Sequence, residues 1–468
     1  MAEDPEAPSA TKTLLPMVLL LGGLSYAAEA QGAFYPGPFH VVVVIVGVAL
    51  LASIVVARSP TWVLPALKDP LVALAGALIL VTVVSSVVAG HPTDAIGTVS
   101  LLLTMAAAVA VVKSLAPQHR QLLLAGIVSL AVIVALIGWV GLVARWQPNA
   151  LTSQGLWRAA STLTYENALG AFLTAPALVC LDRLLTATTR NLTWSLAAFV
   201  LLVGIGASLS RGGILGLVIG IAVLGIFRGA RGLLRLVPPV VGSLIALACL
   251  APSVPVDSST HVTLACVGLF LGAVTAAWNF GSRRLRVPAV LVGIVVLGIA
   301  VTLALTGHVV SDIARARASA SSSDRAHEWA AAWAVARHHL FLGVGTARVL
   351  LQWTVGGQIF TASFAHNEYL QLLTQDGVVG LGVLLGGLAG LFTGLAHRRG
   401  EATAWSAECA IACLVALLVQ SSLDFLWHIP VIPLLTATVL ALATTAAPPT
   451  AGKSTTERAT EEPAPSGP

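Results

Sequence analysis

The sequence predicts an all-α, polytopic integral membrane protein. Hydrophobic residues make up 57% of the chain, charged residues only 10%, and mean hydropathy is +0.91, whereas soluble domains contain about one-quarter charged residues. Apolar runs long enough to cross a hydrocarbon core of about 30 Å recur from one end of the chain to the other. A soluble protein could not bury this much apolar surface, so we exclude the soluble classes.

Fourteen apolar runs are candidate membrane helices, and two weak places reduce the expected number to between 12 and 14. The runs lie at residues 13–29, 39–57, 70–89, 95–112, 121–144, 163–181, 191–209, 212–227, 233–251, 263–280, 288–306, 369–396, 403–420 and 429–446. The chain then divides into an N-terminal cytoplasmic tail (1–12), helices 1–11 (13–306), a long outward connection (307–368), helices 12–14 (369–446) and a cytoplasmic tail (447–468). Because the last tail is rich in Thr, Glu, Pro and Ser, we expect it to be disordered.

The distribution of basic residues orients these helices. Seventeen of the 25 Lys and Arg residues lie in the tails or in the even-numbered connections, whereas the odd-numbered connections around 30–38, 90–94, 252–262 and 421–428 carry none. The positive-inside rule places the first set in the cytoplasm and the second outside. Bases spread over short connections are a topology signal, so the net charge of +5 does not indicate nucleic-acid binding.

Eight basic residues lie on the outer side instead. They are Arg145, Arg158, Arg211, Arg315, Arg317, Arg325, Arg337 and Arg348. Five of them fall in the connection 307–368, and long segments follow the charge rule poorly, so the predicted topology stands. An anionic ligand handled at the outer leaflet would explain why they are there.

The long connection contains one predicted helix. Residues 321–324, three serines and an aspartate, offer an N-cap for a helix that runs to about Arg337. Arg325, Trp329, Trp333 and Arg337 recur at every fourth residue, a pattern typical of a helix at the membrane interface.

Two arginines are candidates for binding an anion. Arg211 stands between two apolar runs beside Gly212 and Gly213, where an arginine is costly unless it pairs or meets a ligand. The alternative, a charge that marks a helix turn, would fit the inner side better. Arg325 begins the predicted loop helix, where a guanidinium beside helix N–H groups suits an anion; the alternative is a salt bridge to Glu328 or Asp324.

His366 is the candidate for proton transfer. It lies directly before the helix expected to start near residue 369 and can take a proton from a hydroxyl near neutral pH. A solvated or capping histidine is the simpler alternative. Glu368 and Asp376 on the same helix are possible partners, and both are also acceptable as helix N-terminal charge.

Other catalytic motifs are absent from the sequence. His327-Glu328 lacks the second histidine of a zinc protease motif, and Gly343-x-Gly345 follows no strand, so it is not a dinucleotide loop. The metal-binding Asp-x-Asp motif of sugar-nucleotide transferases does not occur. We therefore expect neither a metal nor a cofactor.

Several motifs together resemble the bacterial O-antigen ligase and O-antigen polymerase superfamily. They are Arg325 with the two tryptophan-bearing turns, Leu342-Gly343-Val344-Gly345, Ala365-His366-Asn367-Glu368-Tyr369, Gly377-Val378-Val379-Gly380, Ser210-Arg211-Gly212, Tyr165-Glu166-Asn167-Ala168 and the stretch 421–430. The resemblance spans roughly residues 160 to 440.

The resemblance implies a metal-independent, inverting glycosyltransferase at the outer face of the inner membrane. It would move a glycan from undecaprenyl pyrophosphate to an acceptor hydroxyl on lipid A core or on another repeat unit, in the company of other polysaccharide-assembly proteins. Arg211 and Arg325 would hold the pyrophosphate and His366 would act as base or positioner. Further contacts to pyrophosphate or glycan are expected from Asn167, Arg348, Asn367 and Tyr369.

Three alternatives stay open at this point. The shared motifs do not separate a ligase from a polymerase. A secondary transporter of an anionic substrate would also use intramembrane arginines, although it should show repeat symmetry and broken helices at mid-membrane. A membrane scaffold without catalytic activity gives no reason for the outward arginines. The polar residues gather on one predicted face, which favours the enzyme.

Overall fold

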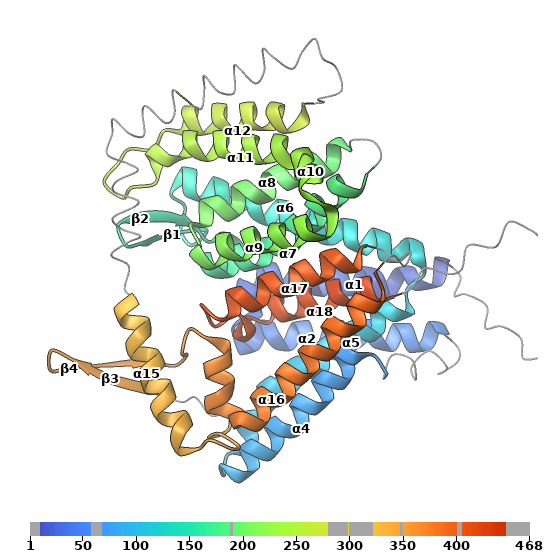
Figure 1. Cartoon of the computed structure of the whole chain (residues 1–468), viewed down its shortest axis with the longest axis vertical. Coiled ribbons are helices and arrows are strands. Elements are labelled where there is room, and N and C mark those ends of the chain that lie inside the picture. The colour runs from blue at the N-terminus through green and yellow to red at the C-terminus, as the bar shows by residue number, and fades with distance from the viewer. Residues whose placement is uncertain are drawn as a thin grey trace, which may run out of the picture.

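The computed structural model describes residues 10–57, 68–187, 191–278, 298, 322–346, 350–399 and 405–445. Within these ranges the chain is a bundle of apolar helices with two short β-hairpins at one end (Figure 1). The predicted fold class, an all-α polytopic membrane protein, is confirmed.

Thirteen of the fourteen predicted runs are helices in the described part of the chain. Eight of the helices there are long and apolar enough to cross a membrane, and five apolar ones are shorter. The helices are α1 (Ala10–Glu29), α2 (Pro36–Ala57), α4 (Pro70–Val88), α5 (Ala95–Ser114), α6 (Pro117–Ala144), α7 (Glu166–Thr186), α8 (Leu192–Ser208), α9 (Arg211–Arg228), α11 (Val237–Leu250), α12 (Val262–Ala277), α16 (Glu368–His397), α17 (Ala407–Ser421) and α18 (Val431–Thr444), with a single turn, α10 (Ala230–Leu233), between α9 and α11. The predicted run at 288–306, apart from residue 298, and the tail 447–468 lie outside the described residues.

Helix ends follow local capping chemistry. Asp69 caps α4 by accepting a hydrogen bond from Leu71 N–H at 2.9 Å, and Pro70 at the first position needs no donor there. Lys113 in the last turn of α5 forms a 2.6 Å ion pair with Asp69. This pair joins two neighbouring helices at the end of the bundle away from the hairpins.

Helix α7 lies at the centre of the bundle. Nearly all of its side chains are buried, and it packs against α6, α8, α9, α17 and α18. Gly170 of α7 lets the start of α9 come close, because an added Cβ would lie 2.9 Å from the Cβ of Ser210. The close contact fixes the first turns of α7 and α9 side by side.

Helix α16 is broken near its start. Gly377 has φ 67° and ψ −166°, a conformation that is accessible essentially only to glycine. The turn at residues 343–345 covers the break: Val344 N–H donates to the Thr374 carbonyl and Gly345 N–H to the next carbonyl, both at 2.9 Å. Backbone groups freed by the break are therefore satisfied by protein, as membrane depth requires. The Gly-Val-Gly motif of the sequence is this turn.

The hairpins and the loop helix lie at the same end of the bundle, on the left in Figure 1. Strands β1 (Ala150–Ser153) and β2 (Leu156–Ala159) pair antiparallel, as do β3 (Leu351–Val355) and β4 (Gln358–Ala362). Helix α15 (Ser322–His338) confirms the helix predicted in the long connection. The two hairpins were not predicted from the sequence.

Candidate active site

A polar pocket of about 300 Å³ opens where the first turns of α7 and α9 meet α15 and the stretch after α17. We call it the arginine pocket, because Arg158, Arg211 and Arg325 line it. Asp424 is the carboxylate that lines it in the described part of the chain, together with the polar side chains of Asn167, Ser210, Gln154 and Gln420. The pocket therefore offers more positive than negative charge.

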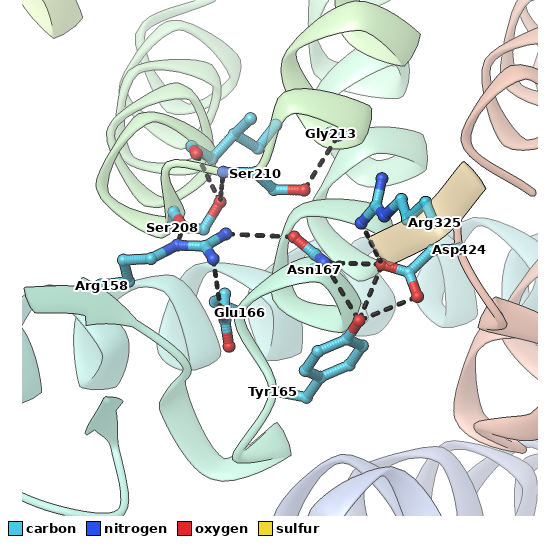
Figure 2. A network of polar contacts seen from close by, with 10 residues as sticks. Arg158, Tyr165, Glu166, Asn167, Ser208, Ser210, Gly213, Arg325 and Asp424 are labelled. Carbon is cyan, nitrogen blue, oxygen red and sulfur yellow. Dashed lines mark hydrogen bonds and ion pairs between the residues drawn. The ribbon is translucent and has the colours of Figure 1, made fainter. Parts of the chain in front are cut away.

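Arg158 enters the pocket from β2. Its side chain is buried and forms an ion pair with Glu166, the first residue of α7. It also donates to the Ser208 carbonyl at 3.0 Å and to Asn167 Oδ1 at 3.1 Å (Figure 2). These contacts join β2 to α7 and to the end of α8, and they fix the guanidinium in one orientation.

Arg211 is the first residue of α9. Ser210 caps this helix by accepting a hydrogen bond from Gly213 N–H at 3.1 Å. Because the first N–H groups of a helix lack partners within the helix, its N-terminus attracts anions. The exposed Arg211 side chain adds its full charge to this partial charge at the edge of the pocket.

Arg325 approaches from α15 and lies 3.9 Å from Asp424. Asp424 is buried and accepts hydrogen bonds from Tyr165 Oη, at 2.7 and 2.8 Å, and from Asn167 Nδ2, at 2.6 Å (Figure 2). The polar network therefore runs from Arg158 through Asn167 and Asp424 to Arg325. It places two arginines from distant parts of the sequence on one pocket.

His366 lies beside the arginine pocket without lining it. Its Nδ1 is 2.9 Å from Glu328 Oε2, and its ring meets the edge of Phe425, the residue after Asp424, at a centroid distance of 4.9 Å. Burial lowers the pKa of His366, but the hydrogen bond with Glu328 and the charge of Asp424 outweigh it, so the pKa lies above its ordinary value. His366 is therefore a paired histidine next to the pocket.

The remaining predicted residues have varied positions. Asn167 lines the pocket. Asn367 caps α16, because its Oδ1 accepts from Tyr369 N–H and Leu370 N–H at 3.1 Å. Tyr369 donates through its hydroxyl to the Leu418 carbonyl at 2.8 Å and so packs towards α17. Arg348 lies outside the described residues. Their predicted contacts with substrate stay predictions.

Residues 258–385 match the O-antigen ligase family. The matched segment contains Arg325, the Gly-Val-Gly turn, His366 and the break in α16. This segment of the chain is therefore similar to the O-antigen ligase family. No curated protein matches the chain.

The O-antigen ligase match covers only part of the site. Arg158, Asn167, Arg211 and Asp424 all lie outside residues 258–385 and are brought to it by the fold. The complete arginine pocket is therefore a product of the three-dimensional structure. No continuous segment of the chain contains it.

Four residues of the site were not proposed from the sequence: Arg158, Tyr165, Glu328 and Asp424. Each carried a signal. Arg158 is one of the bases predicted to lie outside, Glu328 lies one turn after Arg325, and Tyr165 and Asp424 fall in two of the stretches that resemble the O-antigen ligase superfamily. Only the structure shows that Tyr165 and Asp424, 259 residues apart, touch each other.

A second, apolar cavity of about 790 Å³ lies between α2, α4 and α5 on one side and α16, α17 and α18 on the other. Its lining is mostly aliphatic, with Phe364, Glu368 and His428 among the residues at one end. Phe364 stacks on Phe425 at a centroid distance of 4.7 Å. Phe364 thus connects the lining of this apolar crevice to Phe425, which His366 also contacts and which lies in the chain between the pocket-lining residues Asp424 and Leu426.

Proposed function

We propose that this protein is a metal-independent, inverting glycosyltransferase of the O-antigen ligase or polymerase type. It transfers a glycan from undecaprenyl pyrophosphate to an acceptor hydroxyl at the outer face of the inner membrane. The observation that carries the proposal is the arginine pocket beside a paired histidine, in a chain whose residues 258–385 match the O-antigen ligase family.

The pocket suits a pyrophosphate. A guanidinium can donate two parallel hydrogen bonds to phosphate oxygens, and three guanidiniums converge on one small space. Counting the two nearby carboxylates, Glu166 and Asp424, one positive charge remains, to which the N-terminus of α9 adds partial charge. The same groups stabilise the negative charge that develops on a leaving pyrophosphate, so the proposed reaction needs no metal.

His366 supplies the proton acceptor. In the proposed step an acceptor hydroxyl oxygen attacks the anomeric carbon of the donor while its proton passes to the histidine. The bond between that carbon and the pyrophosphate oxygen breaks, and its electron pair leaves with the lipid pyrophosphate. Attack opposite the leaving group inverts the anomeric carbon. The imidazolium then returns its proton to solvent.

The positions of the two cavities support a lipid-linked substrate. The crevice is apolar and lies between membrane helices, and Phe364 in its lining stacks on Phe425, the ring that His366 contacts. An apolar chain gains free energy in such a place roughly in proportion to the area that it buries. We therefore place a lipid chain in the crevice and phosphate in the arginine pocket.

Transport of an anionic substrate is the alternative function. The arginines do not lie midway along the described helices; they gather where helices begin or in the segments between them, at one end of the bundle. This position supports chemistry at a membrane face over passage through mid-membrane. The choice between ligase and polymerase depends on the acceptor, which the test below identifies.

The test is complementation of a deletion strain with membrane levels of each variant measured. We expect Arg211→Ala, Arg325→Ala and His366→Ala to be present but unable to restore surface polysaccharide. Arg337→Ala, an exposed arginine in the last turn of α15, is the matched control and should complement. Accumulated single carrier-linked repeats would identify a polymerase, and full-length carrier-linked chains a ligase. Full complementation by all three variants would reject the transferase and favour transport.

A further inference from the structure

His366 has an unusual backbone conformation. Its φ is +46°, in the left-handed region that residues other than glycine adopt infrequently. The next residue, Asn367, caps α16, so the chain makes a sharp turn at the histidine immediately before the helix begins. Strain of this kind persists only where surrounding contacts impose it, and it is concentrated at functional sites.

The His366 side chain forms a hydrogen bond with Glu328 of α15. The distance from His366 Nδ1 to Glu328 Oε2 is 2.9 Å, and Glu328 is only 8% exposed. An ionised carboxylate accepts hydrogen bonds and donates none, so Nδ1 must carry the proton. In a neutral imidazole the lone pair is then on Nε2.

The charged groups around His366 come from each element packed against it. Glu328 and Arg325 belong to α15, and Asp424 belongs to the stretch after α17. On α16, Glu368 pairs with His428, 3.3 Å away. The two carboxylates nearest His366 favour its protonated form, and Arg325 opposes them without cancelling their effect.

We propose that Glu328 is a positioning residue, which holds His366 with its proton on Nδ1 and leaves Nε2 to take the proton of the acceptor hydroxyl. The inference rests on the proposed transferase function and adds a second residue to its proton transfer. During the step Nε2 gains the hydroxyl proton, Nδ1 keeps its own, and Glu328 stabilises the resulting imidazolium. A carboxylate in this place acts on both the orientation and the basicity of the ring.

The variants are Glu328→Gln, which keeps the size of the side chain and removes its charge, and Glu328→Asp, which keeps the charge on a shorter side chain. His338→Gln, an exposed histidine in the last turn of α15, is the matched control. The first readout needs no glycan. Diethyl pyrocarbonate modifies neutral imidazole, so the rate of modification of His366 depends on its protonation. Measuring this rate as a function of pH, by peptide mass spectrometry on purified protein, gives the pH midpoint of His366 protonation.

We expect the midpoint of His366 to fall by about one pH unit in Glu328→Gln and to stay unchanged in His338→Gln. The rate of glycan transfer by Glu328→Gln should fall about 100-fold near neutral pH, and the acid limb of its pH–rate profile should move to lower pH. Glu328→Asp should recover part of the rate. A merely structural glutamate would change the amount of folded protein and leave the midpoint where it is.

Two failures are distinguishable. A wild type that transfers no glycan refutes the proposed function. If wild type transfers glycan and the folded Glu328→Gln variant has the same His366 midpoint or the same transfer rate as wild type, the proposed role of Glu328 is wrong.

Discussion

Arg158→Met removes the positive member of a buried ion pair. The side chains of Arg158 and Glu166 are 5% and 10% exposed, so the carboxylate left behind would lie in protein without its counter-charge. Loss of one partner of a buried pair costs about 3–5 kcal/mol. We therefore expect the free energy of unfolding to fall by about that amount.

Adding Glu166→Gln to Arg158→Met should restore about 2 kcal/mol, because the unpaired charge is then gone. The double variant still lacks donors for the Ser208 carbonyl and for Asn167 Oδ1, which leaves a deficit of about 1–3 kcal/mol. The two substitutions are thus strongly non-additive, as contacting residues are expected to be.

Denaturant unfolding in detergent micelles, followed by the fluorescence of the 11 tryptophans, measures these differences. Arg399→Met is the control: Arg399 lies 3.8 Å from Glu408, but its side chain is 50% exposed, so its loss should cost less than about 1 kcal/mol. A double variant as unstable as Arg158→Met would refute this account of the pair, as would a single variant that loses less than about 1 kcal/mol. The stable double variant, short of one guanidinium, should still bind lipid pyrophosphate more weakly.

Three further predictions concern the break in α16, the protonation of His366 and the hydrogen bonds to Asp424. Gly377→Ala should lower the free energy of unfolding by at least about 2 kcal/mol in the same assay, because φ 67° with ψ −166° excludes a side chain. The control Gly382→Ala, with open space around the added methyl group, should change it by less than about 1 kcal/mol. Because folding raises the pKa of His366, its contribution to stability is fully present below its unfolded pKa of about 6.5 and disappears as pH rises through the higher folded value. The advantage of wild type over His366→Gln should therefore shrink as pH rises above about 6.5, and an advantage independent of pH would contradict the pairing. Tyr165→Phe removes a donor to Asp424 and should lower the free energy of unfolding by about 1–2 kcal/mol. It should also reduce the amount of surface polysaccharide. A variant that changes neither would show that the network does not position the carboxylate.

The helices were predictable because membrane helices are local. A run of about 20 apolar residues satisfies its own backbone hydrogen bonds and needs no partner to be recognised. Helix α15 was also predictable, since its caps and its four-residue spacing are both in the sequence. Arg211 and Arg325 were found because a charge among apolar residues is conspicuous, and both line the arginine pocket.

The hairpins were missed although one of them has a clear signal. Gly356 and Gly357, both at positive φ, form the two-residue turn between β3 and β4, and Gly-Gly between alternating apolar residues is typical of such turns. Strands of only four or five residues are difficult to recognise in a sequence dominated by long apolar runs. The strand that carries Arg158 was missed for the same reason.

The contacts of the site were not predictable from spacing. Asp424 and Asn167 belong to segments 257 residues apart, and no local pattern indicates that they share a hydrogen bond. The substrate contact that the resemblance implies for Asn367 stays a prediction, and the structure gives this side chain a local role as well, because its Oδ1 caps α16. A polar residue at a helix start has a local structural reason that must be weighed before a functional one.

The proposed transferase requires the arginine pocket to hold a lipid pyrophosphate. Its most direct test is the affinity of purified protein in nanodiscs for undecaprenyl pyrophosphate, with undecaprenyl monophosphate for comparison. We expect Arg211→Gln and Arg325→Gln each to weaken binding of the pyrophosphate at least tenfold. His366→Gln should bind it like wild type, and the control Arg337→Gln should change nothing. Equal affinity of all four variants for the pyrophosphate would show that the arginine pocket does not hold it.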